Sequence, residues 1–219
     1  MLYGENIYKA FGQKAILANV NITVEKGEAV VLTGPSGGGK TTLLRCLSLL
    51  EAPDSGSVEV DGSFYKFSQG IGARTDFPYP YLTIVFQQLF LWPHLTNRDN
   101  ILLSLQNFGE REQEYLNHLI NHFEMKDFID NYPNQSSLGQ KQRVALTRAL
   151  ILDPKYILLD EATSALDDDR AGRVVEELIA LKKKGMGILL ITHSLDLAKQ
   201  VGDRFYKLEK SSLREIFRI

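Results

Sequence analysis

Short apolar runs alternate along the chain with segments of helical periodicity, and this alternation predicts the elements of the core. Residues 28–33, 156–159 and 187–192 are apolar runs of strand length, which is typical of strands buried on both faces. Between the last two, apolar residues recur at the spacing of a helix that packs on a sheet: Ala171, Val174, Val175, Leu178 and Leu181. This order predicts an α/β fold with a mostly parallel sheet.

The stretch from residue 89 to residue 152 carries helix-like patterns and no convincing strand. We therefore expect a helical subdomain at 89–152 that is inserted into an α/β body formed by 1–88 and 153–219. The length of 219 residues fits one domain of this kind.

A glycine-rich turn follows the strand predicted at 28–33 and precedes a helix predicted at 40–50. It matches the pattern G-x-x-x-x-G-K-[ST] with Gly34, Pro35, Ser36, Gly37, Gly38, Gly39, Lys40 and Thr41. Glycines let backbone N–H groups surround phosphate oxygens, the lysine neutralises the β- and γ-phosphates, and the hydroxyl binds Mg²⁺. The motif predicts a P-loop site for a nucleoside triphosphate.

Phosphoryl chemistry also needs a carboxylate for the metal and a group that activates water. Asp160 and Glu161 follow the strand at 156–159, His193 follows the strand at 187–192, and Gln87 follows an apolar run at 82–86. In α/β proteins sites lie at the carboxyl ends of parallel strands, so we expect Asp160 to hold Mg²⁺ and Glu161 to act as the general base. By themselves the acidic pair and the histidine would equally suit helix caps.

Charge and cysteine content bear on the partners of the protein and on its cellular compartment. The 25 Lys and Arg residues against 27 Asp and Glu residues give a net charge of −2, which provides no field for nucleic acid. Cys46 is the only cysteine, as expected in a reducing compartment. The start of the chain lacks the pattern of a signal peptide, and no run approaches 18 apolar residues. We therefore expect a cytoplasmic protein that does not cross a membrane by itself.

In this order the motifs resemble those of the ATP-binding cassette (ABC) ATPases over nearly the whole chain. The resemblance makes 34–42 the Walker A loop, Gln87 the Q-loop, Asp160 and Glu161 the Walker B pair, 164–167 the D-loop and His193 the switch histidine. It also implies a P-loop NTPase core with an N-terminal antiparallel β part. The ATP contacts that the resemblance implies are Phe11, which would stack on adenine, residues 34–42 including Thr42, and Asp160, Ser137, Gly139, Gln140 and Asp167. The Mg²⁺ ligands that it implies are Thr41, Gln87 and Asp160. The catalytic residues that it implies are Glu161, His193, Gln87 and Lys40.

The family's signature motif, L-S-G-G-Q, is altered to Ser136-Ser137-Leu138-Gly139-Gln140. Glycine at the third position would permit unusual backbone angles and close backbone approach, both of which we expect Leu138 to obstruct. In the family each ATP site combines one subunit's P-loop with the other subunit's signature. We therefore expect reduced or asymmetric ATPase activity, with the defect in the partner's site.

Residues 43–47, 55–58, 61–62 and 93–96 most resemble the cassettes of polar amino-acid importers, although cassettes of lipoprotein export and of other substrates share similar stretches. The resemblance implies a second cassette, membrane permease subunits, an importer's substrate-binding protein and a location on the inner face of the cell membrane. A weakly hydrolytic partner in an asymmetric pair is the alternative. A soluble ABC ATPase of DNA or ribosomes is disfavoured, because the chain has neither a second cassette nor a long coiled-coil insertion.

Two further features are interpreted through the resemblance. The apolar cluster at 89–92 is either subdomain core or a groove for a coupling helix of a membrane subunit, and the sequence leaves both open. Residues 205–219 differ from the family's usual tail, so no regulatory C-terminal domain is expected.

Overall fold

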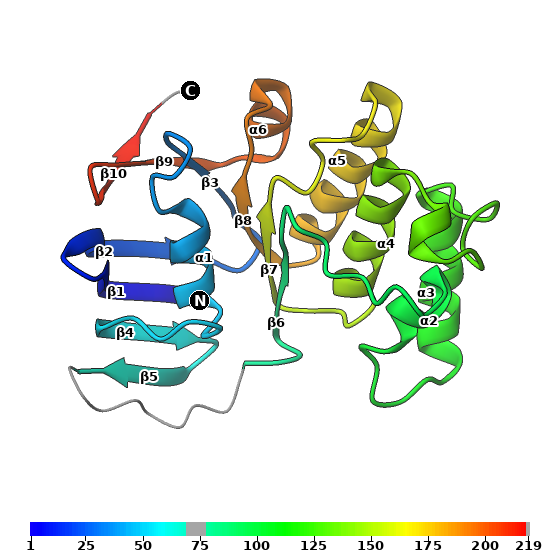
Figure 1. The fold of residues 1–219 in the computed structure, drawn as a ribbon, viewed down its shortest axis with the longest axis horizontal. Helices are drawn as coiled ribbons and strands as arrows, with labels where there is room; N and C mark the ends of the chain where they lie inside the picture. Colours follow the sequence, from blue (N-terminus) through cyan, green and yellow to red (C-terminus); the bar gives the residue numbers. More distant parts are fainter. Residues whose placement is uncertain (69–77, 218–219) are drawn as a thin grey trace.

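The computed structural model describes residues 1–68 and 78–217, and a six-stranded sheet runs through its middle (Figure 1). Five strands are parallel and β10 is antiparallel to its neighbour β9. In spatial order the strands are β10 (Ser212–Ile216), β9 (Arg204–Glu209), β3 (Ala29–Thr33), β8 (Gly187–Ile191), β7 (Tyr156–Asp160) and β6 (Leu82–Val85). The predicted mostly parallel sheet is confirmed.

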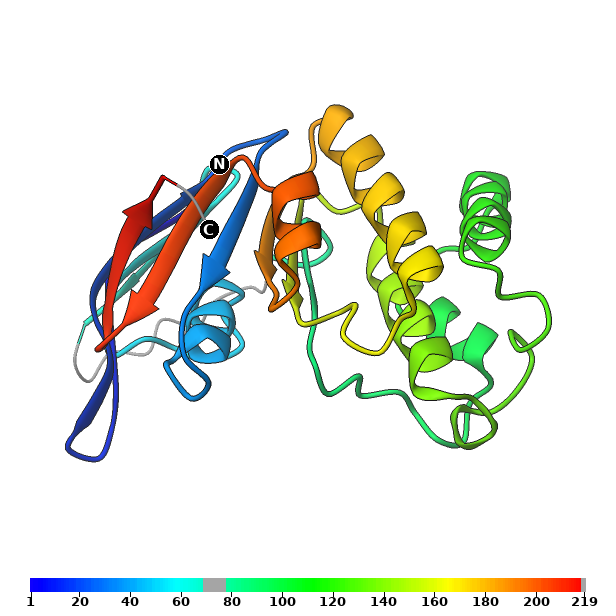
Figure 2. The same cartoon turned by 90° about the horizontal axis from the view of Figure 1, so that it is seen from above.

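The three central strands form where the apolar runs predict them because both of their faces are covered. Alternate residues of β3 enter different cores: Val31 packs in the cluster that includes α5 (Asp168–Lys183) and α6 (Leu195–Val201), and Val30 packs in the cluster that includes α1 (Lys40–Leu47). The helices therefore lie on opposite faces of this sheet (Figure 2).

A second, antiparallel sheet packs on the far side of α1, as the family resemblance implied. Its strand order is β2-β1-β4-β5, and its strands are β2 (Lys14–Val24), β1 (Leu2–Phe11), β4 (Ser55–Val60) and β5 (Ser63–Phe67). Ile7 and Leu17 are fully buried against Leu43 and Leu47 of α1. Helix α1 is thereby held between two sheets, and this packing positions the P-loop at its start.

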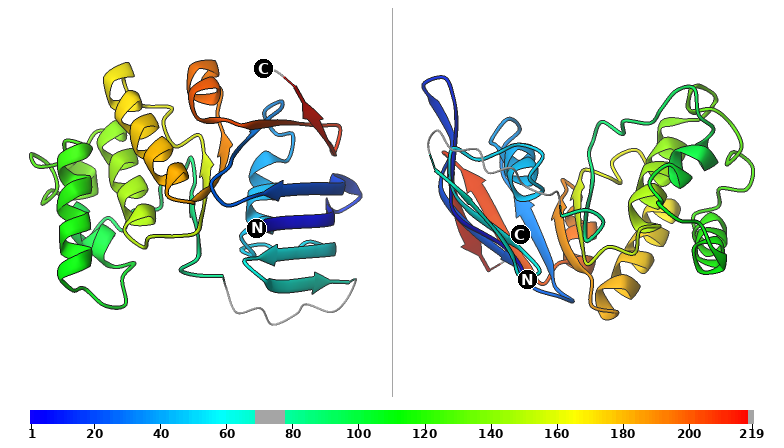
Figure 3. Two further views of the ribbon diagram at one scale, coloured as in Figure 1. Left: turned by 180° about the vertical axis from the view of Figure 1, so that it is seen from behind. Right: turned by 90° about the horizontal axis from the view of Figure 1, so that it is seen from below.

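The remaining helices gather beyond β6 and β7, at the opposite end of the molecule from the antiparallel sheet (Figure 3). They are α2 (Asn97–Leu102), α3 (Glu110–His122), a short 3₁₀ helix (Pro133–Gln135) and α4 (Leu138–Leu150). Buried residues of α3 and α4 share one hydrophobic cluster with β7 and β8. In residues 1–68 and 78–217 no helix is long and apolar enough to span a membrane.

Candidate nucleotide-hydrolysis site

The glycine-rich turn at 34–39 joins β3 to α1 and adopts backbone angles that require glycine. Gly34, Gly37 and Gly39 have φ of 144°, 70° and 99°. A Cβ on Gly34 would lie 2.2 Å from the carbonyl oxygen of Leu208 in β9, so no side chain fits there. Strand β9 therefore lies against the start of the loop, and only glycine allows the loop backbone to come this close to it.

Lys40 is folded into the same loop. Only 8% of the residue is exposed, and its Nζ donates to the carbonyl oxygens of Gly34 at 2.9 Å and Pro35 at 3.0 Å. Gly39 caps α1 without a side-chain hydrogen bond, so the first N–H groups of the helix remain open to an anion. A cationic side chain and unbonded N–H groups in one turn are the chemistry that binds polyphosphate.

Thr41 and Asp160 bring two hard oxygen ligands together from different elements. The Thr41 hydroxyl donates to Asp160 Oδ2 at 2.6 Å. Burial, with a smaller contribution from Glu161, raises the pKa of Asp160, and the Thr41 hydrogen bond opposes that rise. Among the described residues, no three His, Cys, Asp or Glu side chains are arranged to hold a metal ion. The pair still suits Mg²⁺, which commonly takes one or two protein oxygens and completes its shell with phosphate and water.

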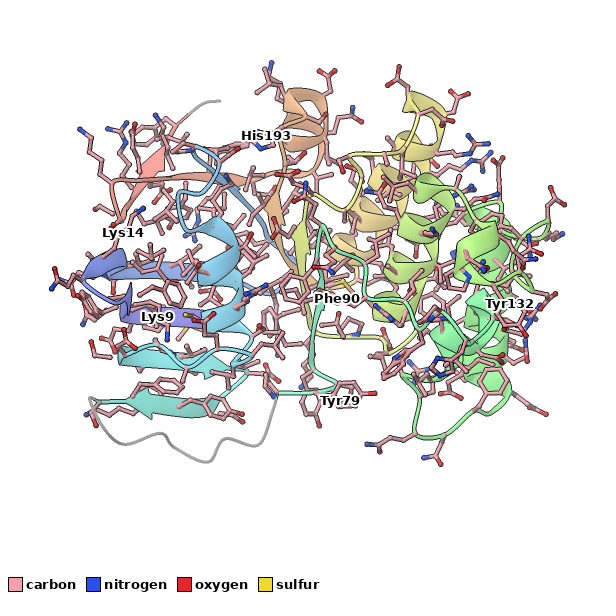
Figure 4. All side chains as sticks on the ribbon, in the orientation of Figure 1. Lys9, Lys14, Tyr79, Phe90, Tyr132 and His193 are labelled. Atoms are coloured by element: carbon pink, nitrogen blue, oxygen red, sulfur yellow. The ribbon has the colours of Figure 1, made fainter. Side chains whose placement is uncertain are left out.

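Glu161 lies between the two polar residues that follow the neighbouring strands. Gln87 Nε2 donates to Glu161 Oε2 at 2.9 Å, and His193 Nε2 lies 3.1 Å from Glu161 Oε1. Figure 4 labels His193 beside the end of β8. Glu161 has a φ of 53°, and its N–H donates to Ile191 O at 3.0 Å. Because β6, β7 and β8 are parallel neighbours, the three side chains meet at one edge of the sheet.

The signature residues form a separate group at the start of α4. Ser137 caps the helix: its backbone N–H donates to Gln140 Oε1 at 2.7 Å, and its hydroxyl accepts from Gln140 N at 3.3 Å. A Cβ on Gly139 would lie 2.9 Å from Ala165 O, so the D-loop packs directly on this glycine. Asp167 ends that loop as the cap of α5. Among the described residues, no hydrogen bond joins this group to the P-loop.

Leu138 does not have the backbone strain that the sequence interpretation assigned to its position. It is the first residue of α4 and is absent from the positive-φ residues of the described chain, so glycine is not needed there for conformation. The residue is 59% exposed. The expected obstruction of close backbone approach remains, because the exposed leucine side chain lies beside the first N–H groups of the helix.

Ser136, which replaces the leucine of the family motif, is buried in a polar pair. Its Oγ accepts from Asn97 Nδ2 at 2.9 Å, and the same amide donates to Phe128 O at 2.8 Å. Asn97 is 0% exposed. The serine is therefore matched by a buried partner on α2, in contrast to the exposed Leu138.

Restoring leucine at this one position should destabilise the protein. Ser136→Leu removes an acceptor from a buried amide and crowds the site, so we expect a loss of about 1–3 kcal/mol of unfolding free energy. Chemical denaturation measures it. Asn97→Val combined with Ser136→Leu is the control and should recover part of the loss, whereas a single variant as stable as the parent would refute the pairing.

Phe11 lies apart from the other candidates, at the tip of the β1–β2 hairpin. The residue is 53% exposed, which suits stacking on a base. The second strand of the hairpin passes the P-loop, since a Cβ on Gly39 would lie 2.8 Å from Ile16 Cγ2.

Comparison with known proteins decides the family. The model of the ABC transporter family matches residues 17–164. The chain belongs to the ABC transporter family. It is 37% identical to the glutamine transport ATP-binding protein GlnQ of Bacillus subtilis, over 98% of this chain and 89% of that protein. It is 39% identical to a probable amino-acid ABC transporter ATP-binding protein of Haemophilus influenzae, over 93% of this chain and 82% of that protein.

Solved structures agree with this assignment. A dimeric ATP-binding cassette in a post-hydrolysis state, bound to ADP and Pi, matches with a TM-score of 0.83 and 29% identity over 99% of this chain and 98% of that one. The ABC resemblance, the P-loop fold and the expected ATPase activity are confirmed. The chain is an ATP-binding and ATP-hydrolysing cassette.

The apolar cluster at 89–92 of this ABC cassette is partly core and partly exposed. Leu89 is buried and Leu91 packs on the core, whereas Phe90 and Trp92 are half-exposed. Arg148 of α4 donates to Leu89 O at 2.8 Å and Phe90 O at 2.9 Å, which fixes the segment to the helices. Arg148 also lines a cavity of about 570 Å³, whose walls are mainly Leu50, Pro78, Tyr79, Leu82, Ile84, Ala149 and Leu152.

Two contacts of the cassette escaped the sequence interpretation. Asn97 was not recognised as the partner of Ser136, because the two are 39 residues apart. The contact of Lys9 with the Phe11 ring could have been found from the sequence, because residues two apart on a strand share a face.

Proposed function

We propose that this cassette powers the import of polar amino acids. The observation that carries the proposal is its similarity over 98% of its length to cassettes named for glutamine, L-cystine and arginine transport. The cargo itself would contact other subunits, since cargo selection in such systems belongs to membrane and binding proteins. Residues 89–152 would form the helical subdomain, inserted into a body of 1–88 and 153–219.

In this proposal one ATP molecule binds along the P-loop. Phe11 stacks on adenine, residues 34–39 and Thr42 surround the phosphates, and the Lys40 Nζ exchanges its carbonyl partners for β- and γ-phosphate oxygens. Thr41, Gln87 and Asp160 would hold Mg²⁺. The chemistry that Mg²⁺ supplies when bound is neutralisation of phosphate charge.

Glu161 then accepts a proton from water as the water oxygen attacks the γ-phosphorus. The bond from that phosphorus to the β,γ-bridging oxygen breaks, giving ADP and phosphate. Gln87 and His193, each in hydrogen-bond range of a different Glu161 oxygen, keep the carboxylate aimed at the water. The convergence of these three side chains supports a hydrolytic role over a purely structural one.

A second cassette would complete each site, with Ser137, Gly139, Gln140 and Asp167 facing the nucleotide on its P-loop. The exposed Phe90 and Trp92, and the apolar cavity that Arg148 lines, suit a helix of a permease subunit, because exposed aromatic residues anchor interfaces. The cassette would then sit on the inner face of the cell membrane, in an importer that includes a substrate-binding protein. Nucleic acid is no part of this assembly.

Transport assays test the proposal. The cassette, co-expressed with permease subunits and the substrate-binding protein from neighbouring genes and reconstituted in liposomes, should drive ATP-dependent uptake of labelled glutamine, arginine or cystine. Vesicles loaded with ADP are the control. Purification with ribosomes or DNA and without membrane proteins would contradict it, and uptake of none of the three amino acids would remove the proposed cargo class.

A weakly hydrolytic partner in an asymmetric pair is the second candidate. The exposed Leu138 in the signature favours it, whereas the intact Glu161 and His193 favour full activity of the ATP site on this chain.

A further inference from the structure

Lys9 of β1 is an ammonium group held in place by the segment that follows helix α1. Its Nζ donates to Ala52 O at 2.8 Å and lies 3.4 Å from carboxylate oxygens of both Glu51 and Asp54. Only 13% of the side chain is exposed. A lysine fixed by three oxygen acceptors has lost the mobility that lysines have on surfaces.

The cation also contacts the ring of Phe11. Lys9 Nζ lies 5.6 Å from the centroid of that ring, within the range of a cation–π interaction. Burial lowers the pKa of Lys9, but the carboxylates of Asp54 and Glu51 outweigh it and the net pKa is raised, so the charge is permanent at neutral pH. Because Phe11 is largely exposed, a base can still stack on the ring.

The segment that anchors Lys9 is connected to the P-loop through helix α1. Asp54 N donates to Tyr8 O at 2.8 Å and Asp54 Oδ2 accepts from Ala10 N at 2.8 Å, so β1 is tied to residues 51–54 by backbone as well as side-chain bonds. Residues 51–54 come after α1, whose first residue is Lys40. Helix α1 and the short turn at 48–50 therefore connect the phosphate loop to the anchor of the Phe11 ring.

We propose that Lys9 is a positioning residue for the purine end of the nucleotide, fixing the Phe11 ring at a set distance from the P-loop. The inference rests on the proposed adenine contact of Phe11. Triphosphate binding by the P-loop does not depend on Lys9.

The test is steady-state ATPase kinetics of the reconstituted transporter carrying Lys9→Met. We expect KM for ATP to rise about 2- to 5-fold, the value of an exposed cation–π contact, with kcat unchanged. The inhibition constant of inorganic tripolyphosphate, which has no base, should stay as in the parent. Lys66→Met, on the exposed edge strand β5, is the matched control and should alter neither constant.

A double-mutant cycle separates this inference from the proposal beneath it. If Phe11→Ala leaves KM for ATP unchanged, the adenine contact itself is wrong. If Phe11→Ala raises KM and Lys9→Met raises it by the same factor with and without the ring, Lys9 acts elsewhere and the inference is overturned. If Lys9→Met does not fold, Lys9→Gln replaces it, because glutamine keeps a donor for Ala52 O. An unchanged KM for ATP in Lys9→Gln also overturns the inference.

Discussion

Glu161→Gln should abolish turnover of the transporter while leaving ATP binding intact. Glutamine has the size of glutamate and can still hydrogen-bond to His193, but its amide cannot take the proton of the attacking water. A general base contributes about 10²- to 10⁴-fold to rate, so phosphate release should fall by that factor. Retained radiolabelled ATP, measured after gel filtration of the complex, should equal or exceed that of the parent.

Glu176→Gln is the matched control for this variant. Glu176 is an exposed residue of α5, and its loss should leave phosphate release unchanged. A Glu161→Gln transporter that keeps a tenth or more of the parental rate would contradict the role of Glu161 as base. Loss of ATP binding would instead show that the carboxylate is needed to build the nucleotide site.

The central strands could be predicted from sequence because burial on both faces produces an unbroken apolar run. The predicted ranges 28–33, 156–159 and 187–192 differ from β3, β7 and β8 by one residue at an end. Helix α1 was predicted to reach residue 50 but ends at Leu47. The apolar pattern continues past that end, whereas the backbone turns at Leu49, where φ is 60°.

The antiparallel sheet could not be predicted from local pattern, and only the family resemblance implied it. The inside–outside alternation of β1 is broken by register shifts between Gly4 and Ile7 and again further along. Its partner β4 lies about 50 residues later in the chain. Strands of this kind are defined by long-range pairing, which a single sequence does not display.

The candidate site divides in the same way. Gln87, Glu161 and His193 could be placed at one sheet edge because each follows a predicted parallel strand. The hydrogen bonds of Glu161 to both neighbours depend on strand order, which the sequence does not specify. At Leu138 the expectation of strained backbone was wrong, because the helix begins at that residue and gives it ordinary helical angles.

Leu138→Gly should raise the turnover of the assembled transporter. The cap by Ser137 satisfies Gln140 N, so the N–H groups of Leu138 and Gly139 have no partner within the helix. In the proposed dimer they face the γ-phosphate bound by the other cassette, and the exposed leucine side chain keeps the phosphate away. A hydrogen bond to a charged group contributes about 1.5 kcal/mol or more, so each one gained predicts about a tenfold increase.

Graded and matched variants separate this effect from a general change in the helix. Leu138→Ala should give an intermediate rate, because its side chain is short. Leu195 is also an exposed leucine that opens a helix after a serine cap, so Leu195→Gly should have a similar cost in helix stability and no gain in turnover. If Leu138→Gly melts like Leu195→Gly but turns over no faster than the parent, the altered signature does not limit hydrolysis, and the asymmetric pair loses its structural support.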